Sequence, residues 1–126
     1  MTRPILVDTD ILVDFFRGGK NAVDFINKYS DRIILSAIGV AELFAGVKGD
    51  KEKAVLEDFF SIFPVIPVSR QIVKRGGLYK RSYGKSHGIG LSDAVIAATA
   101  ELENAELKTL NIKHYPMFKG LRPAYK

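Results

Sequence analysis

The sequence predicts a single α/β domain with a central, mostly parallel sheet flanked by helices. Short runs of aliphatic and β-branched residues alternate along the chain with longer segments of helical periodicity, which is the pattern of a sheet covered by helices. The chain has 126 residues, of which 47% are hydrophobic, so it is the size of one domain and can bury one core. We therefore expect one domain over residues 1–126.

Each expected element follows from local patterning. The expected strands are Ile5–Val7, Ile33–Leu35, Val65–Val68 and Leu107–Leu110. The expected helices are Asp10–Phe16, Lys20–Tyr29, Ile38–Val47, Lys51–Phe63, Arg70–Tyr83 and Ser92–Glu103. The glycine-rich segment 84–90 is expected to be a loop that leads into the last helix.

Capping signals mark several of these helix ends. Asp10 can cap the start of the first helix, and Gly18 and Gly19 can end it. Ser92 can cap the last long helix, which would place Asp93 in its first turn.

Three acidic residues are set into apolar segments. Asp8 ends the run 4–7, Glu42 lies within 37–45, and Asp93 opens the run 94–98. A carboxylate withdrawn from water is unfavourable unless it is paired, hydrogen-bonded or bound to a metal. We therefore expect the three acids to share one cationic partner, with a divalent metal as the leading candidate.

Each of these acids also has an ordinary structural explanation. Asp93 can be a helix-start acid that the helix dipole favours, and Asp8 can be a turn former at the end of a strand. Glu42 can form a salt bridge with an arginine. Glu42 is nevertheless the most diagnostic of the three, because it has apolar neighbours on both sides within one helix.

The positions of the acids favour one site at one edge of the sheet. Ligands of open parallel sheets gather at the carboxyl ends of the strands, where Asp8 and Asn111 are expected, and Glu42 and Asp93 can reach the same edge. Mg²⁺ and Mn²⁺ prefer oxygen ligands and assist phosphodiester hydrolysis. We assign Asp8, Glu42 and Asp93 as metal ligands and catalytic residues. Asn111 is a further catalytic candidate that can orient a water.

Several neighbouring residues have weaker claims to the site. We assign Asp10 mainly to capping, and His114 mainly to packing within a loop. The hydroxyls of Thr9, Ser36 and Thr109 can hydrogen-bond the acids, although small hydroxyls at strand ends are more often turn residues.

The charge distribution favours an anionic partner. The formal net charge is +5, and residues 70–87 carry six lysine or arginine residues and no acid. That segment can follow RNA phosphates, with Tyr79 or Tyr83 as stacking candidates, or it can be an ordinary solvated helix face. Cysteine is absent, which excludes disulfides and thiolate chemistry. We find no signal peptide or membrane-spanning run and expect a cytoplasmic protein without a membrane partner.

Four motifs stand out along the chain, in the order Val7-Asp8-Thr9-Asp10, Ala41-Glu42-Leu43, the block from Leu91 to Ala100, and Thr109-Leu110-Asn111-Ile112-Lys113-His114-Tyr115. Together they resemble the PIN-domain ribonucleases, and especially the VapC toxins of type II toxin–antitoxin modules. The block around Asp93 is the most specific of them, and the resemblance covers essentially the whole chain.

The resemblance implies a PIN-like fold and a metal-dependent endoribonuclease. Asp8, Glu42 and Asp93 match the acids that bind Mg²⁺ or Mn²⁺ in the family, which cuts single-stranded or loop RNA and leaves a 5′-phosphate and a 3′-hydroxyl. Asn111 stands where many members have a fourth acid.

The resemblance also implies a homodimer and a cognate antitoxin, whose amphipathic segment would lie in a hydrophobic groove. The candidate groove residues are Phe15, Phe16, Phe44, Phe59, Phe60 and Phe63. Each of these rings can instead simply be buried in the core.

Three other functions are compatible with parts of the sequence. A haloacid-dehalogenase-type phosphatase also begins with a strand and Asp-x-Asp, but Leu12 departs from its motif. A housekeeping RNA-processing nuclease would share the acids. A non-catalytic RNA-binding or partner-binding module would use them only to receive basic side chains.

Overall fold

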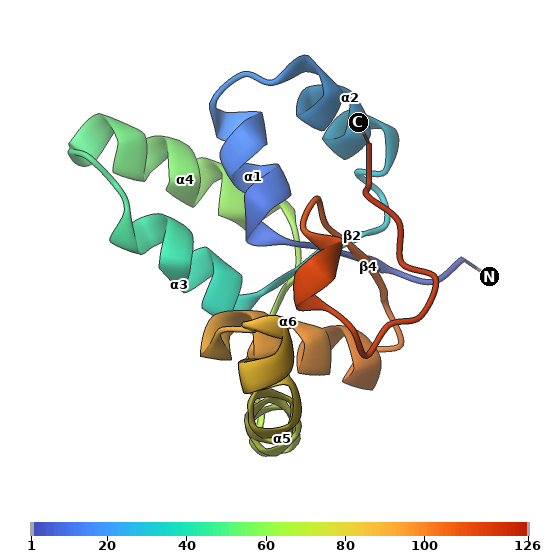
Figure 1. Cartoon of the computed structure of the whole chain (residues 1–126). Coiled ribbons are helices and arrows are strands. Elements are labelled where there is room, and N and C mark those ends of the chain that lie inside the picture. Colours follow the sequence, from blue (N-terminus) through green and yellow to red (C-terminus); the bar gives the residue numbers. More distant parts are fainter. Residues whose placement is uncertain (1, 126) are drawn as a thin grey trace.

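A parallel four-stranded sheet forms the centre of the structure, a computed structural model that describes residues 2–125 (Figure 1). The strands are β1 (Ile5–Val7), β2 (Ile33–Ser36), β3 (Val65–Ile66) and β4 (Glu106–Lys108). Their order is β3-β2-β1-β4, and each neighbouring pair is parallel. The predicted α/β class is confirmed. The outer residues of the expected domain, 1 and 126, lie outside the described part.

Within residues 2–125, six helices and one 3₁₀ turn connect and cover the strands. The helices are α1 (Thr9–Phe16), α2 (Lys20–Lys28), α3 (Ala37–Ala45), α4 (Asp50–Ile62), α5 (Arg70–His87) and α6 (Leu91–Leu102), and the 3₁₀ turn η1 is Ile112–His114. None of the helices in residues 2–125 has the length and apolar character that a membrane crossing requires.

The two faces of the sheet pack against different helices. Ile5 and Val7 point into a cluster with residues of α1, α2 and α4, whereas Leu6 packs with Ile96 and Ala97 of α6. This alternation follows from the period of two residues in a strand. Figure 1 shows α1 and α2 on one side of the strands and α5 and α6 on the other. Residues that follow the strands therefore emerge between two packed layers.

Three expected helix ends were wrong. The side chain that caps α1 is that of Asp8, which accepts a hydrogen bond from Thr9 N, and Asp10 lies inside the helix. Helix α6 starts at Leu91 after Gly90, so Ser92 does not cap it, although Asp93 is in the first turn as expected. Helix α5 continues to His87 and ends at Gly88, whose positive φ of 66° suits glycine.

The expected loop at 84–90 is thus helical in its first half. Gly84 lies inside α5, and the helix ends four residues later at Gly88, whose N donates to the Gly84 carbonyl. Strand β4 also ends earlier than expected, at Lys108, which leaves Thr109, Leu110 and Asn111 in the turn beyond the strand.

Helices α5 and α6 approach each other closely at a glycine. A Cβ atom at Gly76 would lie 3.0 Å from Cγ2 and 3.1 Å from Cα of Val95. The next residue, Gly77, is exposed, and a Cβ atom there would meet nothing within 4 Å. Only the first of the two glycines is therefore required for packing.

We expect opposite effects when each of these glycines is replaced by alanine. Gly77→Ala should raise the free energy of unfolding by about 1 kcal/mol, because alanine favours a helix over glycine. Gly76→Ala should instead lower it by about 1 kcal/mol, because the clash with the α6 backbone outweighs that gain. Thermal unfolding of both variants would show shifts of a few degrees in opposite directions. Equal stabilisation by both substitutions would contradict the close packing.

Candidate active site

Asp8 is a buried carboxylate held by three hydrogen-bond donors. Asp8 directly follows β1 and is 4% exposed. Oδ1 accepts from Thr9 N at 2.7 Å, and Oδ2 accepts from the hydroxyls of Thr109 and Tyr115, each at 2.8 Å. Strand β4 is the neighbour of β1 in the sheet, which places Thr109 beside Asp8. The carboxylate is thereby fixed in position and orientation.

The electrostatics of Asp8 oppose its ionisation. Burial, followed by repulsion from Asp10, raises the pKa of Asp8 to about 6, although the three donors act in the opposite direction. Burial also raises the pKa of Asp10. A nearby cation would relieve both effects, because it would compensate the desolvation and screen the repulsion.

Asp10 ties the start of α1 to the turn after β4. Its Oδ2 accepts from Leu110 N at 2.9 Å and lies 3.1 Å from the Thr109 hydroxyl. Its Oδ1 is buried and has no hydrogen-bond partner among the described residues. Asp10 therefore anchors the turn after β4 instead of capping the helix, as we had expected.

Asp93 is linked to Asp8 through Tyr115. The Tyr115 hydroxyl lies 3.4 Å from Oδ1 of Asp93, and Nδ1 of His114 lies 2.9 Å from its Oδ2. Because a carboxylate can only accept, the His114 ring donates here from Nδ1. Asn111 lies beside the same ring, with its amide nitrogen 3.1 Å from Nδ1, but two donors face each other there and make no hydrogen bond while Nδ1 donates to Asp93. His114 therefore contacts the acid directly, which the sequence did not lead us to expect.

Glu42 joins the same edge from helix α3. The Thr9 hydroxyl donates to Oε1 of Glu42 at 3.3 Å. Gly39, one turn earlier, lets this helix approach closely, because a Cβ atom there would lie 3.2 Å from the Thr9 hydroxyl oxygen. Glu42 itself is exposed, so our expectation that all three acids are withdrawn from water was wrong for it. The helix is short and lies at the surface, and its apolar neighbours do not cover the carboxylate.

The three predicted acids are thus connected through Thr9 and Tyr115. Contacts run from Glu42 through Thr9 to Asp8, and then through Tyr115 to Asp93. Within residues 2–125, however, no three Asp, Glu or His side chains form a group that could hold a metal ion as they stand. The acids are separated by hydroxyl groups in this arrangement.

Tyr115 is the contact residue that our sequence reasoning overlooked. A signal was present, since Tyr115 follows an expected strand end near Asn111, and a tyrosine hydroxyl needs a partner wherever it is buried. Thr9 and Thr109 do hydrogen-bond acids. Ser36 does not share that role, because its hydroxyl accepts from Ile38 N at the start of α3.

Known proteins match this chain over most of its length. The family model for the PIN domain matches residues 5–115. The chain is 36% identical over 124 residues to ribonuclease VapC10 of Mycobacterium tuberculosis, which covers 96% of this chain and 92% of that protein. It is 42% identical over 125 residues to ribonuclease VapC19 of the same species, which covers 95% and 98%.

The chain belongs to the VapC ribonuclease toxins of the PIN-domain family. Solved structures agree with that placement. A toxin–antitoxin complex from Klebsiella pneumoniae matches with a TM-score of 0.83 and 29% identity, over 97% of this chain and 98% of that one. FitAcB from Neisseria gonorrhoeae matches with a TM-score of 0.71 and 28% identity, over 88% and 90%. The phosphatase alternative is therefore excluded.

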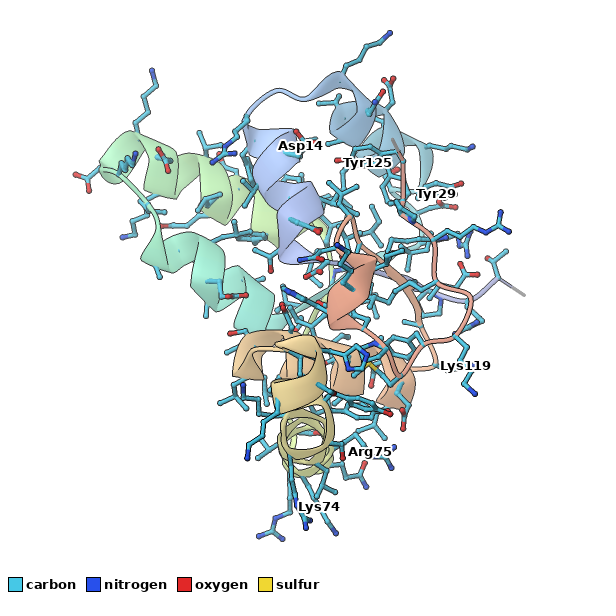
Figure 2. The ribbon with its side chains drawn as sticks, in the orientation of Figure 1. Asp14, Tyr29, Lys74, Arg75, Lys119 and Tyr125 are labelled. Atoms are coloured by element: carbon cyan, nitrogen blue, oxygen red, sulfur yellow. The ribbon has the colours of Figure 1, made fainter. Side chains whose placement is uncertain are left out.

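The basic segment of this VapC chain is the long helix α5. Ile72 and Gly76 are buried and Tyr79 and Tyr83 are half-buried, which leaves the charged residues on the outer face. Arg75 pairs with Glu101, and Lys80 donates to the Ile89 carbonyl. In Figure 2 the Lys74 side chain points away from the body of the protein. Lys74, Arg81 and Lys85 are exposed.

A groove of about 600 Å³ lies between α1, α3 and α4 and includes Glu42. Its apolar lining residues are Val13, Phe16, Leu43, Val55 and Leu56. Our expected aromatic lining was mostly wrong. Phe59, Phe60 and Phe63 are buried, and Phe15 and Phe44 pack against the core, so Phe16 is the one of the six rings that lines this groove in the described chain. Aliphatic residues supply most of the apolar surface instead.

The raised pKa of Asp8 predicts how stability depends on pH in the absence of metal. The folded state holds the Asp8 proton more tightly than the unfolded chain, so stability should fall as pH rises from about 4 through about 6. Asp8→Asn lacks this penalty. Relative to the wild type, it should therefore gain on the order of 2 to 3 kcal/mol of unfolding free energy between pH 4 and pH 7.

Denaturant unfolding of both proteins in a chelator, at several pH values across this range, would measure the difference. Parallel stability profiles for the wild type and Asp8→Asn would show that the buried carboxylate carries no such penalty.

Proposed function

We propose that this chain is a divalent-metal-dependent endoribonuclease that hydrolyses phosphodiester bonds in single-stranded or loop RNA. Asp8, Glu42 and Asp93 would hold Mg²⁺ or Mn²⁺. The observation that carries the proposal is the buried Asp8 carboxylate at the carboxyl edge of the sheet. Thr9 connects it to Glu42, and Tyr115 connects it to Asp93. The ribonucleases to which the chain is similar support the reaction class.

The residues at this edge fit a hard divalent cation. The donors are carboxylate, hydroxyl and amide oxygens, which Mg²⁺ and Mn²⁺ prefer. Asp8 and Asp10 lie close enough for repulsion to raise the pKa of Asp8, and Oδ1 of Asp10 is buried without a partner among residues 2–125. Mg²⁺ keeps several waters, so the acids need not form a close three-ligand cage to bind it. When bound, the cation supplies an activated water and stabilises the departing oxyanion.

The protein's own groups orient the acids for this task. Thr9, Thr109 and Tyr115 fix the Asp8 carboxylate, and His114 holds one oxygen of Asp93. The Asn111 amide lies against the His114 ring and is exposed, so it can orient a water or contact a phosphate at the mouth of the site. Because Asn111 carries no charge, it offers a second metal less negative charge than an acid at this position would.

Removing the charge of any one of these acids should abolish cleavage. We expect Asp8→Asn, Glu42→Gln and Asp93→Asn each to lower the Mn²⁺-dependent cleavage rate by at least about 100-fold while the fold is retained, because each weakens the metal site without changing side-chain size. Asp24→Asn and Glu103→Gln, at exposed acids elsewhere, are matched controls. The readout is cleavage of total RNA with and without Mn²⁺, with circular dichroism as the check on folding. Full activity in any two of the three site variants would refute the assignment.

Helix α5 is proposed to bind the RNA backbone. Its last turns lead through residues 88–90 directly to the first turn of α6, which carries Asp93, so Arg81 and Lys85 stand closest to the site along the chain. Phosphate contacts position RNA without reading its sequence.

We expect the double substitution of Arg81 and Lys85 by alanine to weaken RNA binding across sequences. It should also make the salt dependence shallower, by about 0.7 in the logarithmic slope for each lost contact with a single strand. The matched control replaces Lys20 and Lys28 on α2, at the same cost in net charge. Binding titrations at several salt concentrations with an inactive Asp93→Asn background would measure both slopes. An identical slope in the two double variants would make α5 an ordinary solvated face.

The groove between α1, α3 and α4 is the proposed seat of an antitoxin segment. The support is its apolar lining together with Glu42 within it, which would receive a basic side chain from an amphipathic partner. Solved relatives of this chain are toxin–antitoxin complexes. Such a segment would cover Glu42 and so disable the active site.

Expression in a bacterial host tests this groove. We expect the protein alone to arrest growth, and co-expression of the antitoxin encoded beside it to restore growth. Val55→Glu, at a half-exposed groove residue, should abolish that rescue because it places a charge in the apolar lining. Ile62→Glu, on the same helix but outside the groove lining, should be rescued like the wild type. Equal rescue of both variants would place the antitoxin elsewhere.

Two expectations from the sequence remain proposals about assembly. One PIN-like domain should account for residues 1–126, and two copies should form a homodimer. Sedimentation analysis of the purified protein would distinguish a dimer from a monomer.

A further inference from the structure

We infer that the Tyr115 hydroxyl is a positioning group of the active site, which orients the Asp8 carboxylate for metal binding and links it to Asp93. The inference rests on the proposed function, because it assigns a role within the same metal site. Tyr115 would contact neither the metal nor the RNA, and would act through the two acids.

The hydrogen bonds to Asp8 leave one of its oxygens available. Oδ2 accepts from both the Tyr115 and Thr109 hydroxyls at 2.8 Å, which occupies its two lone pairs. Oδ1 accepts only from Thr9 N among the described residues. One lone pair of Oδ1 is therefore free for a cation, and rotation of the carboxylate would break the two bonds at Oδ2. Tyr115 and Thr109 together fix which oxygen faces the site.

The same hydroxyl also lies between acids from different elements. It is 2.8 Å from Oδ2 of Asp8, which follows β1, and 3.4 Å from Oδ1 of Asp93, in the first turn of α6. The hydroxyl carries one proton, which it donates to Asp8 at the shorter distance, and it places a neutral group rather than another charge beside Asp93.

The position of the hydroxyl is set by the core. Tyr115 is 1% exposed and packs in the cluster that contains Leu6, Ile96 and Leu107. Its backbone is also fixed, since Tyr115 N donates to the Ile112 carbonyl. Because the ring is held by β1, β4 and α6, its oxygen acts as a rigid support for the carboxylates. Phenylalanine would fill the same space without that oxygen.

Tyr115→Phe separates the role of the hydroxyl from that of the ring. The matched control is Tyr125→Phe, which removes another hydrogen bond from a phenol to a carboxylate. The Tyr125 hydroxyl donates to Oδ2 of Asp14 at 2.6 Å, away from Asp8 and Asp93. In Figure 2 Tyr125 and Asp14 lie at the α2 end of the molecule. Calorimetric titration with Mn²⁺ gives the affinity of each protein. A second measure is the rise in melting temperature that saturating Mn²⁺ causes in each protein, relative to the same protein without metal.

We expect Tyr115→Phe to bind Mn²⁺ about tenfold more weakly than the wild type, in line with the loss of other supporting groups at metal sites. Tyr125→Phe should bind like the wild type. RNA cleavage by Tyr115→Phe should be impaired at low Mn²⁺ and should recover when Mn²⁺ is raised.

Other outcomes would overturn the inference. Unchanged or tighter Mn²⁺ binding by Tyr115→Phe would show that the hydroxyl merely satisfies its own hydrogen bond, and would leave the proposed metal site intact. A cleavage defect that saturating Mn²⁺ does not repair would indicate a structural role. Absence of Mn²⁺ binding by the wild-type protein would refute the metal site and the inference together.

Discussion

The buried carboxylate of Asp8 is the interaction on which the site depends. It ends β1, caps α1 through Thr9 N, and accepts hydroxyl hydrogen bonds from Thr109 and Tyr115 in the chain beyond β4. One side chain therefore joins β1 and the chain beyond its neighbour, the edge strand β4, to the first helix. Its burial and the nearby Asp10 make ionisation unfavourable, whereas its three donors favour it, and the balance raises its pKa to about 6.

The adjacency of β1 and β4 makes this arrangement possible. Their parallel pairing places Val7 opposite Lys108, so the residues that follow each strand meet at the same edge. The tail of the chain reinforces the turn there, since Ala124 N donates to the Thr109 carbonyl. Helix α3 brings Glu42 to that edge, where Thr9 contacts it, and α6 brings Asp93, which Tyr115 contacts. The topology accounts for the convergence of residues that lie more than 80 positions apart in sequence.

Strongly periodic segments could be predicted from the sequence, because their hydrophobic pattern is the pattern of burial. The parallel sheet and the positions of its six helices follow from that pattern. Helix ends were predicted less well where two caps compete. Asp8 and Asp10 are both suitable caps, and the buried hydrogen bonds of Asp8 with Thr109 and Tyr115, which are 101 and 107 residues away, decide between them. Local sequence carries no information about such distant contacts.

Exposure of single side chains was the least predictable property. Glu42 is surrounded by apolar residues in sequence, yet it is exposed because α3 lies beside an open groove. The phenylalanines that suggested a groove are mostly packed against one another, as in the contact of Phe59 with Phe63. Tyr115 was missed although it follows an expected strand end, because only the tertiary structure places its hydroxyl beside two acids.

Direct observation of Asp8 ionisation tests whether this buried carboxylate is held in readiness for a cation. The measurement is an NMR titration of the ¹³C-labelled carboxyl carbon of Asp8, assigned with Asp8→Asn, with and without Mg²⁺. Without Mg²⁺ the pKa of Asp8 should be near 6, and with Mg²⁺ it should fall substantially, because the cation stabilises the anion. An ordinary pKa near 3.8 that does not respond to Mg²⁺ would contradict the account.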